Sequence, residues 1–275
     1  MTAISTETPA AAGSSFYTAM RILPPAQRDG MYQVYAFCRA VDDIADEGGT
    51  RPERLAGLAQ WRADIEKFYV GGGTTSLTCG LAGPAAEFKL RRQDFLAVID
   101  GMEMDARADI IAPDWVTLDL YCDRVASAVG RLSVRIFGIE DKAGIELSHH
   151  LGRALQLTNI LRDLDEDAGI GRLYLPREAL RKAGIDSDEI ASVLAHPALT
   201  NACLEVANRA RGHFETADAI MAAQPRSAIK SPRIMATVYR GILDKLMARG
   251  WTAPRQKASP SKSQIVWAVL RHGMF

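Results

Sequence analysis

The chain has 275 residues, 48% of them hydrophobic, so it is long enough to bury a sizeable core. Its 33 basic and 33 acidic side chains give a formal net charge of zero, which argues against nucleic acid as a partner. Ala, Leu, Arg and Glu are frequent and runs of β-branched residues are few, which predicts an all-α protein. The four cysteines form no C-x-x-C pair, a pattern typical of free thiols in a reducing cytoplasm.

The expected elements begin with a disordered tail over residues 1–13, followed by a short helix that opens at Ser14 and stops before two prolines. These prolines suit the first turn of a long helix that a glycine pair ends. Residues 71–83 are an expected loop, and two further prolines, Pro197 and Pro225, precede long helices. The main helices are expected at about 25–47, 51–70, 84–106 (with a break), 114–137, 141–166, up to 223 and up to 249, with a short one from 175.

No composition break divides these helices, so residues 14–250 are expected to form one helical domain, with a basic segment at 251–275. From residue 226 onward the chain carries ten Lys or Arg and one acid. Contact with an anionic membrane and a solvated tail are equal alternatives for this segment, whose aromatic and basic residues are Trp251, Trp267, Arg255, Lys257, Lys262 and Arg271. With no signal peptide and no run of eighteen apolar residues, we expect a cytoplasmic protein, with peripheral contact to the inner face of the membrane as an alternative to a fully solvated one.

Two polar stripes stand out from the apolar background of the long helices. The first lies at i, i+4, i+7 and i+11 and consists of Tyr35, Arg39, Asp42 and Asp46. The second lies at i, i+3, i+7 and i+11 and consists of Gln156, Asn159, Asp163 and Asp167. Such spacings place each stripe on one helix face. Two acidic stripes that face each other would repel unless cations lay between them.

Oxygen ligands without His or Cys favour Mg²⁺ over zinc or copper, and Mg²⁺ is usually completed by water and substrate phosphates. The predicted metal ligands are therefore Asp42, Asp46, Asn159, Asp163 and Asp167. The alternative, a pair of solvated acidic helix ends, is disfavoured because both stripes have the same form. A calcium loop that starts at Asp163 is excluded, because Ala168 and Tyr174 occupy the positions that need Gly and Glu.

Cationic residues beside the stripes provide candidate partners for diphosphate. Arg39 and Arg162 adjoin the two stripes, and Arg172 and Tyr174 follow the second. Guanidinium groups bind phosphate oxygens in a bidentate manner. The alternative for each arginine is an ordinary ion pair with a neighbouring acid. Asp105, in a third acidic segment without a partner stripe, is expected to be structural.

These motifs resemble the squalene/phytoene synthase family from Ser14 to about Arg249. The resemblance rests on Tyr35-Ala-Phe-Cys-Arg39, on Asp42-Asp43-x-x-Asp46, on Gln156-Leu-Thr-Asn159-Ile-Leu-Arg162-Asp163 with Asp167, and on Arg172-Leu-Tyr174-Leu-Pro176. It implies a single all-α domain of the isoprenoid synthase fold, in which helices surround a central cavity for two prenyl diphosphates and a Mg²⁺ cluster. By the same resemblance Asp42, Asp46, Asp163 and Asp167 are catalytic, and further residues lie near diphosphate or the reacting ends: Ser15, Phe16, Tyr35, Arg39, Tyr121, Gln156, Arg162, Arg172 and Tyr174.

Within the family, the stretches around Ser14, Cys38 and Asp119 are most similar to bacterial members that join two farnesyl diphosphates into presqualene diphosphate for hopanoids. A prenyltransferase of this kind is the expected enzyme, with downstream pathway enzymes as possible partners. The alternatives are a sister enzyme, namely phytoene, squalene or hydroxysqualene synthase, and a non-catalytic member, which the intact stripes disfavour. Either released pyrophosphate or Tyr121 takes the proton lost in ring closure. Phe16, Tyr35 and Tyr121 either stabilise the cation or pack in the core.

Overall fold

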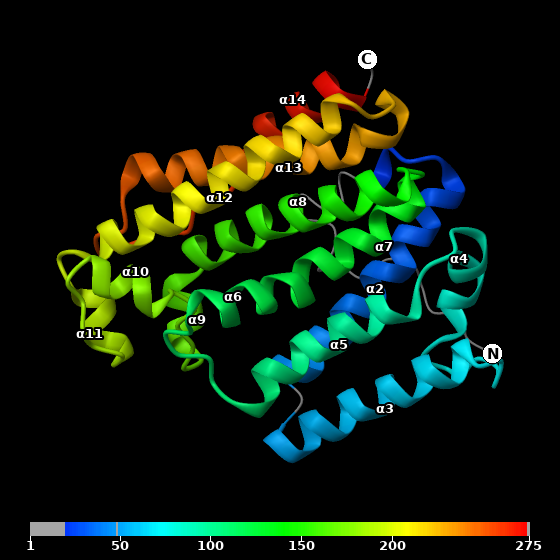
Figure 1. Ribbon diagram of the computed structural model, residues 1–275, viewed down its shortest axis with the longest axis horizontal. Helices are drawn as coiled ribbons and strands as arrows, with labels where there is room; N and C mark the ends of the chain where they lie inside the picture. Colours follow the sequence, from blue (N-terminus) through cyan, green and yellow to red (C-terminus); the bar gives the residue numbers. More distant parts are fainter. Residues whose placement is uncertain (1–19, 48, 274–275) are drawn as a thin grey trace.

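The computed structural model describes residues 20–47 and 49–273, and within these ranges every regular element is a helix (Figure 1). The all-α prediction is therefore confirmed. In chain order the helices are α2 (Pro25–Glu47), α3 (Arg51–Tyr69), α4 (Ala82–Glu87), α5 (Arg92–Arg107), α6 (Trp115–Cys122), α7 (Ala128–Phe137), α8 (Asp141–Arg162), α9 (Leu164–Gly169), α10 (Arg177–Lys182), α11 (Ile190–Ala195), α12 (Leu199–Ala222), α13 (Arg226–Arg249) and α14 (Lys262–Gly273). A 3₁₀ turn spans Cys79–Leu81, and a π turn spans Asp123–Ser127.

Three of the expected helices are interrupted. The helix expected at 84–106 with a break does divide, into α4 and α5 around Lys89, whose φ of 51° is left-handed. The helix expected at 114–137 contains the π turn between α6 and α7. The helix expected at 141–166 ends at Arg162, because Asp163 leaves helical geometry with φ −103° and ψ 17°. The apolar spacing of the other two segments is continuous, so their breaks depend on tertiary contacts that local sequence does not specify.

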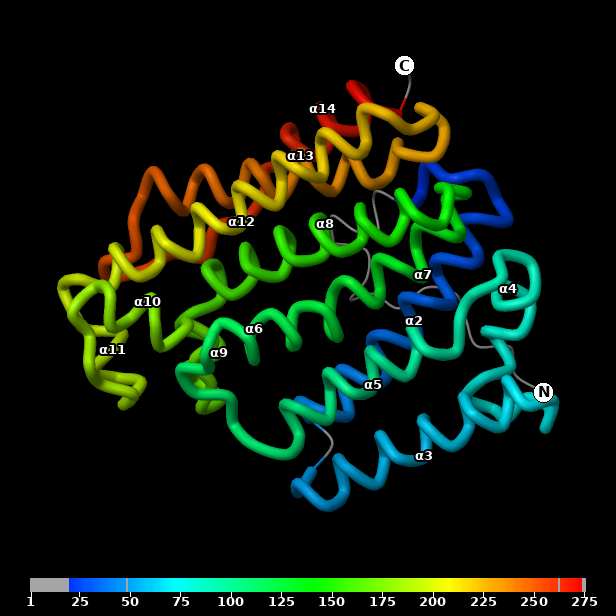
Figure 2. The backbone as a smooth tube through the Cα atoms, in the orientation of Figure 1, coloured from blue at the N-terminus to red at the C-terminus, as the bar shows by residue number. Residues whose placement is uncertain are grey.

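Helix α8 lies at the centre of the molecule. It packs against α7 and the π turn on one side and against α12 and α13 on the other, and α5 joins α7 to α2 and α3. The tube view shows the same layers, with α9, α10 and α11 gathered at one end (Figure 2). Two apolar cores result, one around α8, α12 and α13 and one around α2, α3 and α5.

Small residues let α8 approach α7 and the π turn closely. A Cβ atom on Gly152 would lie 2.7 Å from the Cα of Ser127, and one on Gly130 would lie 3.2 Å from the Cα of Ser148. These neighbours are backbone atoms, which cannot rotate away as the end of a side chain can. The glycines therefore set the distance between the two helices.

We expect Gly152→Ala to lower the free energy of unfolding by about 1–3 kcal/mol, because the added methyl group must push α8 away from the π turn. Gly212→Ala is the matched control, since Gly212 is exposed on α12 and an added Cβ there meets no atom within 4 Å. This control should raise stability by about 0.5–1 kcal/mol. Urea denaturation measures both changes, and equal stability of the two variants would contradict the close approach.

Two arginines, the buried Arg153 and the partly buried Arg131, hold the π turn in place. Arg153 on α8 donates Nε to Asp119 at 2.7 Å and Nη1 to Asp123 at 3.3 Å. Arg131 on α7 contacts Asp123 from the other side and donates Nε to Asp94 at 2.6 Å. A π turn inside an α-helix is rare and frequently marks a functional site. Here it is fixed by ion pairs from two helices.

The segment after α13 is packed onto the helical body. Trp251 is fully buried, and its Nε1 donates to the carbonyl of Leu161 at 2.8 Å. Arg255 forms an ion pair with Asp165, and Lys257 lies 3.4 Å from Asp163. Trp251, Arg255 and Lys257 therefore contact the protein itself, and membrane contact of the segment stays a prediction.

Residues 1–13 lie outside the described part of the chain, so the tail and the boundaries at residues 14 and 250 stay predictions. Among the described residues, no helix is both long enough and apolar enough to cross a bilayer.

Candidate active site

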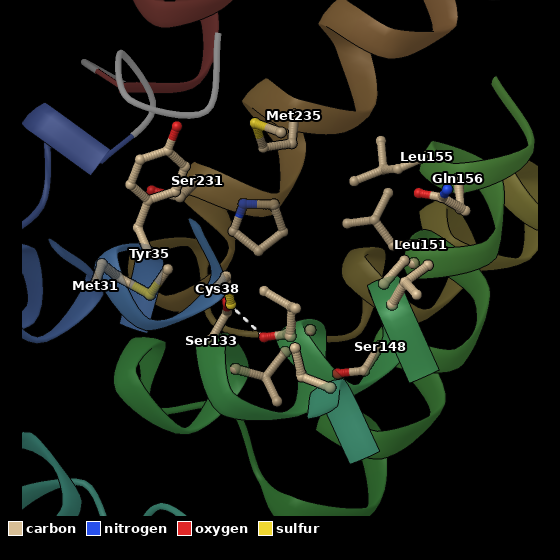
Figure 3. A pocket seen from close by; sticks show the side chains of 18 of the residues that line it. Met31, Tyr35, Cys38, Ser133, Ser148, Leu151, Leu155, Gln156, Ser231 and Met235 are labelled. Carbon is tan, nitrogen blue, oxygen red and sulfur yellow. Dashed lines mark hydrogen bonds between the residues drawn. The ribbon is translucent and has the colours of Figure 1, made fainter. Parts of the chain in front are cut away.

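A cavity of about 430 Å³ lies between α2, α5, α7, α8, α13 and the π turn. Most of its lining is apolar. Figure 3 shows Tyr35 and Cys38 approaching it from α2, Leu151 from α8 and Met235 from α13. At one end the lining becomes polar, with Arg39, Asp42, Gln156, Asn159 and Tyr239. The cavity is thus an apolar chamber with a charged mouth, a form suited to a chain with a polar head.

The first stripe reaches this mouth from α2. Arg39 donates Nη1 to Asp42 at 2.7 Å and also pairs with Asp43. Half of the Arg39 side chain remains exposed. Burial and the nearby Asp46 raise the pKa of Asp42 to about 6. The sequence analysis left two roles open for Arg39, an ion pair with a neighbouring acid and a contact with phosphate. Arg39 forms the ion pair, and its exposed half leaves room for the phosphate contact as well.

The second stripe reaches the same mouth from the end of α8 and from α9. Arg162 donates Nε to Asp163 at 2.8 Å and also contacts Tyr239 of α13. Burial and the charge of Asp163 raise the pKa of Asp167 to about 7. Asn159 belongs to the same stripe, and its side-chain amide donates a long hydrogen bond of 3.4 Å to the side-chain oxygen of Gln156. Because the helix breaks at Asp163, Asp167 lies on α9 and not on a continuation of α8.

Arg172 connects the two stripes. It is buried, donates Nη1 to Asp46 at 2.8 Å, and its Nε lies 3.9 Å from Asp105. Asp105 acts electrostatically on both stripes, since its charge contributes to the raised pKa values of Asp42 and Asp167. The structure therefore brings the stripes together across one mouth, with Arg172 and Asp105 between them.

Asp105, which the sequence analysis expected to be structural, lies between the two stripes. Its carboxylate accepts hydrogen bonds from Tyr121 at 2.9 Å and from Tyr174 at 2.7 Å, and it is only 4% exposed. The two phenol rings stack with centroids 4.9 Å apart. The other acids of that segment, Asp100 and Glu103, do form structural ion pairs with Arg62.

Tyr121 is buried beneath the carboxylates and does not line the apolar cavity. Burial, with the negative charge of Asp105, raises its pKa well above the ordinary value of 10. A phenol held protonated in this way is a poor acceptor for the proton lost in ring closure. The released diphosphate is the better candidate of the two that the sequence left open.

The remaining sequence predictions divide into two groups. Tyr35, Arg39, Asp42, Gln156 and Asn159 line the cavity. Around its mouth lie Asp46, Arg162, Asp163, Asp167, Arg172 and Tyr174. Ser15 and Phe16 fall outside the described residues. Tyr239, on the cavity wall beside Arg162, was missed, because one tyrosine in an apolar helix carries no distinctive pattern.

The donor set at the mouth fits a divalent cation. The Asn159 side-chain oxygen is buried and has no hydrogen-bond partner among the described residues. Two carboxyl groups have raised pKa values, and nearby negative charge contributes to both shifts. Within the described ranges no three His, Cys, Asp or Glu side chains form a ready-made cluster for a metal. Mg²⁺ does not require one, because it takes one or two carboxylates and completes its shell with water and phosphate.

Comparisons with known proteins agree with this geometry. The family model for squalene/phytoene synthase matches residues 10–264. The chain is 55% identical to a presqualene diphosphate synthase of Rhodopseudomonas palustris, over the whole of both chains. It is 57% identical to a presqualene diphosphate synthase of Sinorhizobium fredii, over 90% of this chain and 88% of the relative.

Solved structures agree as well. A squalene synthase from Alicyclobacillus acidocaldarius superposes with a TM-score of 0.78 at 28% identity, covering 86% of this chain and 89% of the other. A dehydrosqualene synthase superposes with a TM-score of 0.83 at 26% identity, covering 95% and 91%. The isoprenoid synthase fold implied by the sequence resemblance is confirmed.

Proposed function

Because the chain belongs to the squalene/phytoene synthase family, we propose that it joins two molecules of farnesyl diphosphate head to head into presqualene diphosphate. The observation that carries the proposal is the apolar cavity, whose polar end is lined by Asp42 of the first stripe and Gln156 and Asn159 of the second. Relatives more than 50% identical that are named for this product support it. As a prenyltransferase of this type, it would supply squalene or hopanoid synthesis.

The arginines at the mouth would bind diphosphate. Arg39, Arg162 and Arg172 each carry a planar group suited to two phosphate oxygens. Each is already held by a carboxylate, which fixes its orientation before substrate arrives. Gln156, Tyr174 and Tyr35 would complete this end, and Ser15 and Phe16 stay predicted contacts.

The residues proposed to hold Mg²⁺ are Asp42, Asp46, Asn159, Asp163 and Asp167. When bound there, the cation would neutralise the departing diphosphate. The apolar walls of the cavity exclude water from the allylic cation until the second farnesyl double bond attacks it. Tyr35, on the cavity wall, faces that cation and stabilises it through its ring. Tyr121, which donates a hydrogen bond to Asp105, would help to fix the position of Tyr174 at the mouth of the cavity.

The product is a lipid diphosphate, and we extend the proposal to a peripheral contact of the C-terminal segment with the inner face of the membrane. Supply of presqualene diphosphate to downstream enzymes would occur at that surface. The cytoplasmic location is part of this proposal.

A product assay with the purified full chain, farnesyl diphosphate and Mg²⁺ tests the activity. We expect presqualene diphosphate as the end product both without and with NADPH, resolved by mass spectrometry, and no turnover when a chelator is added. Squalene formed only with NADPH would identify a full squalene synthase. Turnover of a longer prenyl diphosphate, or of presqualene diphosphate itself, in place of farnesyl diphosphate would assign the chain to a sister enzyme.

A further inference from the structure

A second hollow, of about 530 Å³, lies between α12, α13 and α14, and is here called the α13–α14 groove. Helix α13 separates it from the catalytic cavity. Met235 and Tyr239 face the cavity, whereas Arg233 and Thr237 face the groove. Figure 1 shows α14 running along α13 at the surface of the molecule. The groove therefore lies one helix thickness from the substrate.

Helices α13 and α14 run antiparallel along this groove, and Asp218 of α12, which pairs with Arg240, also acts electrostatically on His272. Thr237 Oγ1 lies 3.0 Å from His272 Nε2, and Lys245 Nζ lies 2.8 Å from Gln264 Oε1. Arg233 and Arg271 therefore lie together at one end of the groove, where both act electrostatically on His272. Asp244 lies near the other end, on the turn of α13 before Lys245.

Two of the lining cations are available to bind an anion. Arg240 is committed to Asp218, with 2.7 Å between Nη2 and Oδ2. Within residues 20–47 and 49–273, Arg233 and Arg271 form no ion pair with a carboxylate. Arg271 instead lies over the Trp267 ring, 4.8 Å from its centroid. Beside them, burial together with the charges of Arg271 and Arg233 lowers the pKa of His272, which leaves a neutral imidazole next to the Thr237 hydroxyl.

The edge of the groove is an exposed apolar strip on α14. Val266, Trp267 and Leu270 are 56%, 51% and 46% exposed, and they occupy positions i, i+1 and i+4. The opposite face of the helix packs on the core through Ile265, Ala268 and Val269. Helix α14 is therefore apolar on both faces, with arginine beside tryptophan at its surface. Tryptophan and arginine together are favoured at the boundary between lipid headgroups and acyl chains.

We propose that the α13–α14 groove binds the phosphate headgroup of an anionic phospholipid through Arg233 and Arg271, while Val266, Trp267 and Leu270 enter the membrane beside it. Thr237 and His272 add hydrogen bonds to the same phosphate. This site gives the proposed membrane contact its residues and its ligand, and it rests on the proposed function only in that the product is a lipid.

A membrane fits this surface better than a second copy of the chain. Stable dimers bury about 800 Å² on each partner, whereas this strip contains three side chains on a short helix. A twofold contact would also bring the unpaired arginines of the two copies towards each other. An anionic bilayer provides both the negative charge and the apolar layer.

Flotation of the full chain with vesicles tests the proposal, without substrate. We expect binding to phosphatidylcholine vesicles that contain phosphatidylglycerol, and little binding to phosphatidylcholine alone. Arg233→Gln/Arg271→Gln and Trp267→Ala/Leu270→Ala should each weaken this binding at least about tenfold. The matched control is Val116→Ser/Arg181→Gln, which removes one exposed apolar and one exposed basic side chain from elsewhere and should bind as the unaltered chain does.

Several results would overturn the proposal. These are equal binding to neutral vesicles, unchanged binding by Arg233→Gln/Arg271→Gln, or binding of inorganic phosphate at the groove without any vesicle binding. A dimer in sedimentation that Trp267→Ala/Leu270→Ala abolishes, with no vesicle binding, would assign the strip to a second copy. Turnover of detergent-dispersed farnesyl diphosphate is measured on the same proteins. Because the two assays are independent, loss of turnover with intact vesicle binding would count against the activity alone.

Discussion

Replacing Asp42 or Asp167 with asparagine is expected to lower kcat about 10²- to 10³-fold, because each variant removes a charge that would hold the cation against the departing diphosphate. Both side chains lie at the mouth of the cavity, on opposite stripes. The measurement is the turnover of farnesyl diphosphate at saturating Mg²⁺. Glu166→Gln is the control, since Glu166 adjoins Asp167 in sequence but points to Lys257.

The same two variants should retain the fold, and their stability should respond differently to pH. Burial and neighbouring acids raise the pKa of Asp42 from 3.8 to about 6 and that of Asp167 to about 7. A carboxyl group with a raised pKa contributes stability that is present below pH 3.8 and is lost as the pH rises through 6 and 7. Asparagine does not titrate, so each variant, with a chelator present, should lose less stability over this range than the unaltered chain.

Thermal melting and circular dichroism distinguish this result from simple misfolding. Retained turnover in either variant would contradict the proposed metal site. Loss of turnover together with loss of helix content would show that the carboxylates are needed for the fold instead.

Asp105→Asn is expected to lower kcat by about 10- to 100-fold, the usual range for a group that orients residues around a metal. Asp105 does not line the cavity, but it accepts hydrogen bonds from the hydroxyl groups of Tyr121 and Tyr174 and attracts Arg172. Asparagine has one carbonyl oxygen, so it can accept only part of these interactions. Its amide group would face a phenol that was a donor to the carboxylate. Tyr174 and Arg172 would then lose their fixed positions beside Asp46.

The matched control is Asp100→Asn on the same helix, which removes an equal charge from a partly buried ion pair with Arg62 and should leave kcat unchanged. If Asp105 positions the mouth, KM for farnesyl diphosphate should change less than kcat. A fall in melting temperature alone, with both kinetic constants unaltered, would make Asp105 a purely structural residue.

Much of the architecture could be predicted from local sequence. Proline at the start of α2 and the Thr50–Glu53 capping box of α3 are local signals, and the structure has both helices within a residue or so of their predicted ends. The spacing of Asp42 and Asp46, four residues apart, is also a local signal, and it correctly placed both side chains on one face of α2. The position of Asp105 could not be read in this way, because its partners Tyr121 and Tyr174 are 16 and 69 residues away.

The π turn shows the same limit from another side. Its five residues continue the apolar spacing of the flanking helices, and no glycine or proline marks it. The π turn is distinguished by two salt bridges to Asp123, one from Arg131 on α7 and one from Arg153 on α8. Contacts between distant segments fixed this interruption, and the sequence pattern predicted only the helix that it divides.

The packing of Trp251 under the end of α8 has a consequence for synthesis of the protein. The carboxylates proposed as catalytic, up to Asp167, leave the ribosome well before residues 251–257, which contact Leu161, Asp165 and Glu166. A nascent chain can therefore form most of its helices while the second stripe still lacks its support. A premature stop codon just after α13 would yield a protein that has every carboxylate proposed as catalytic but lacks the contacts that residues 251–257 make with the second stripe.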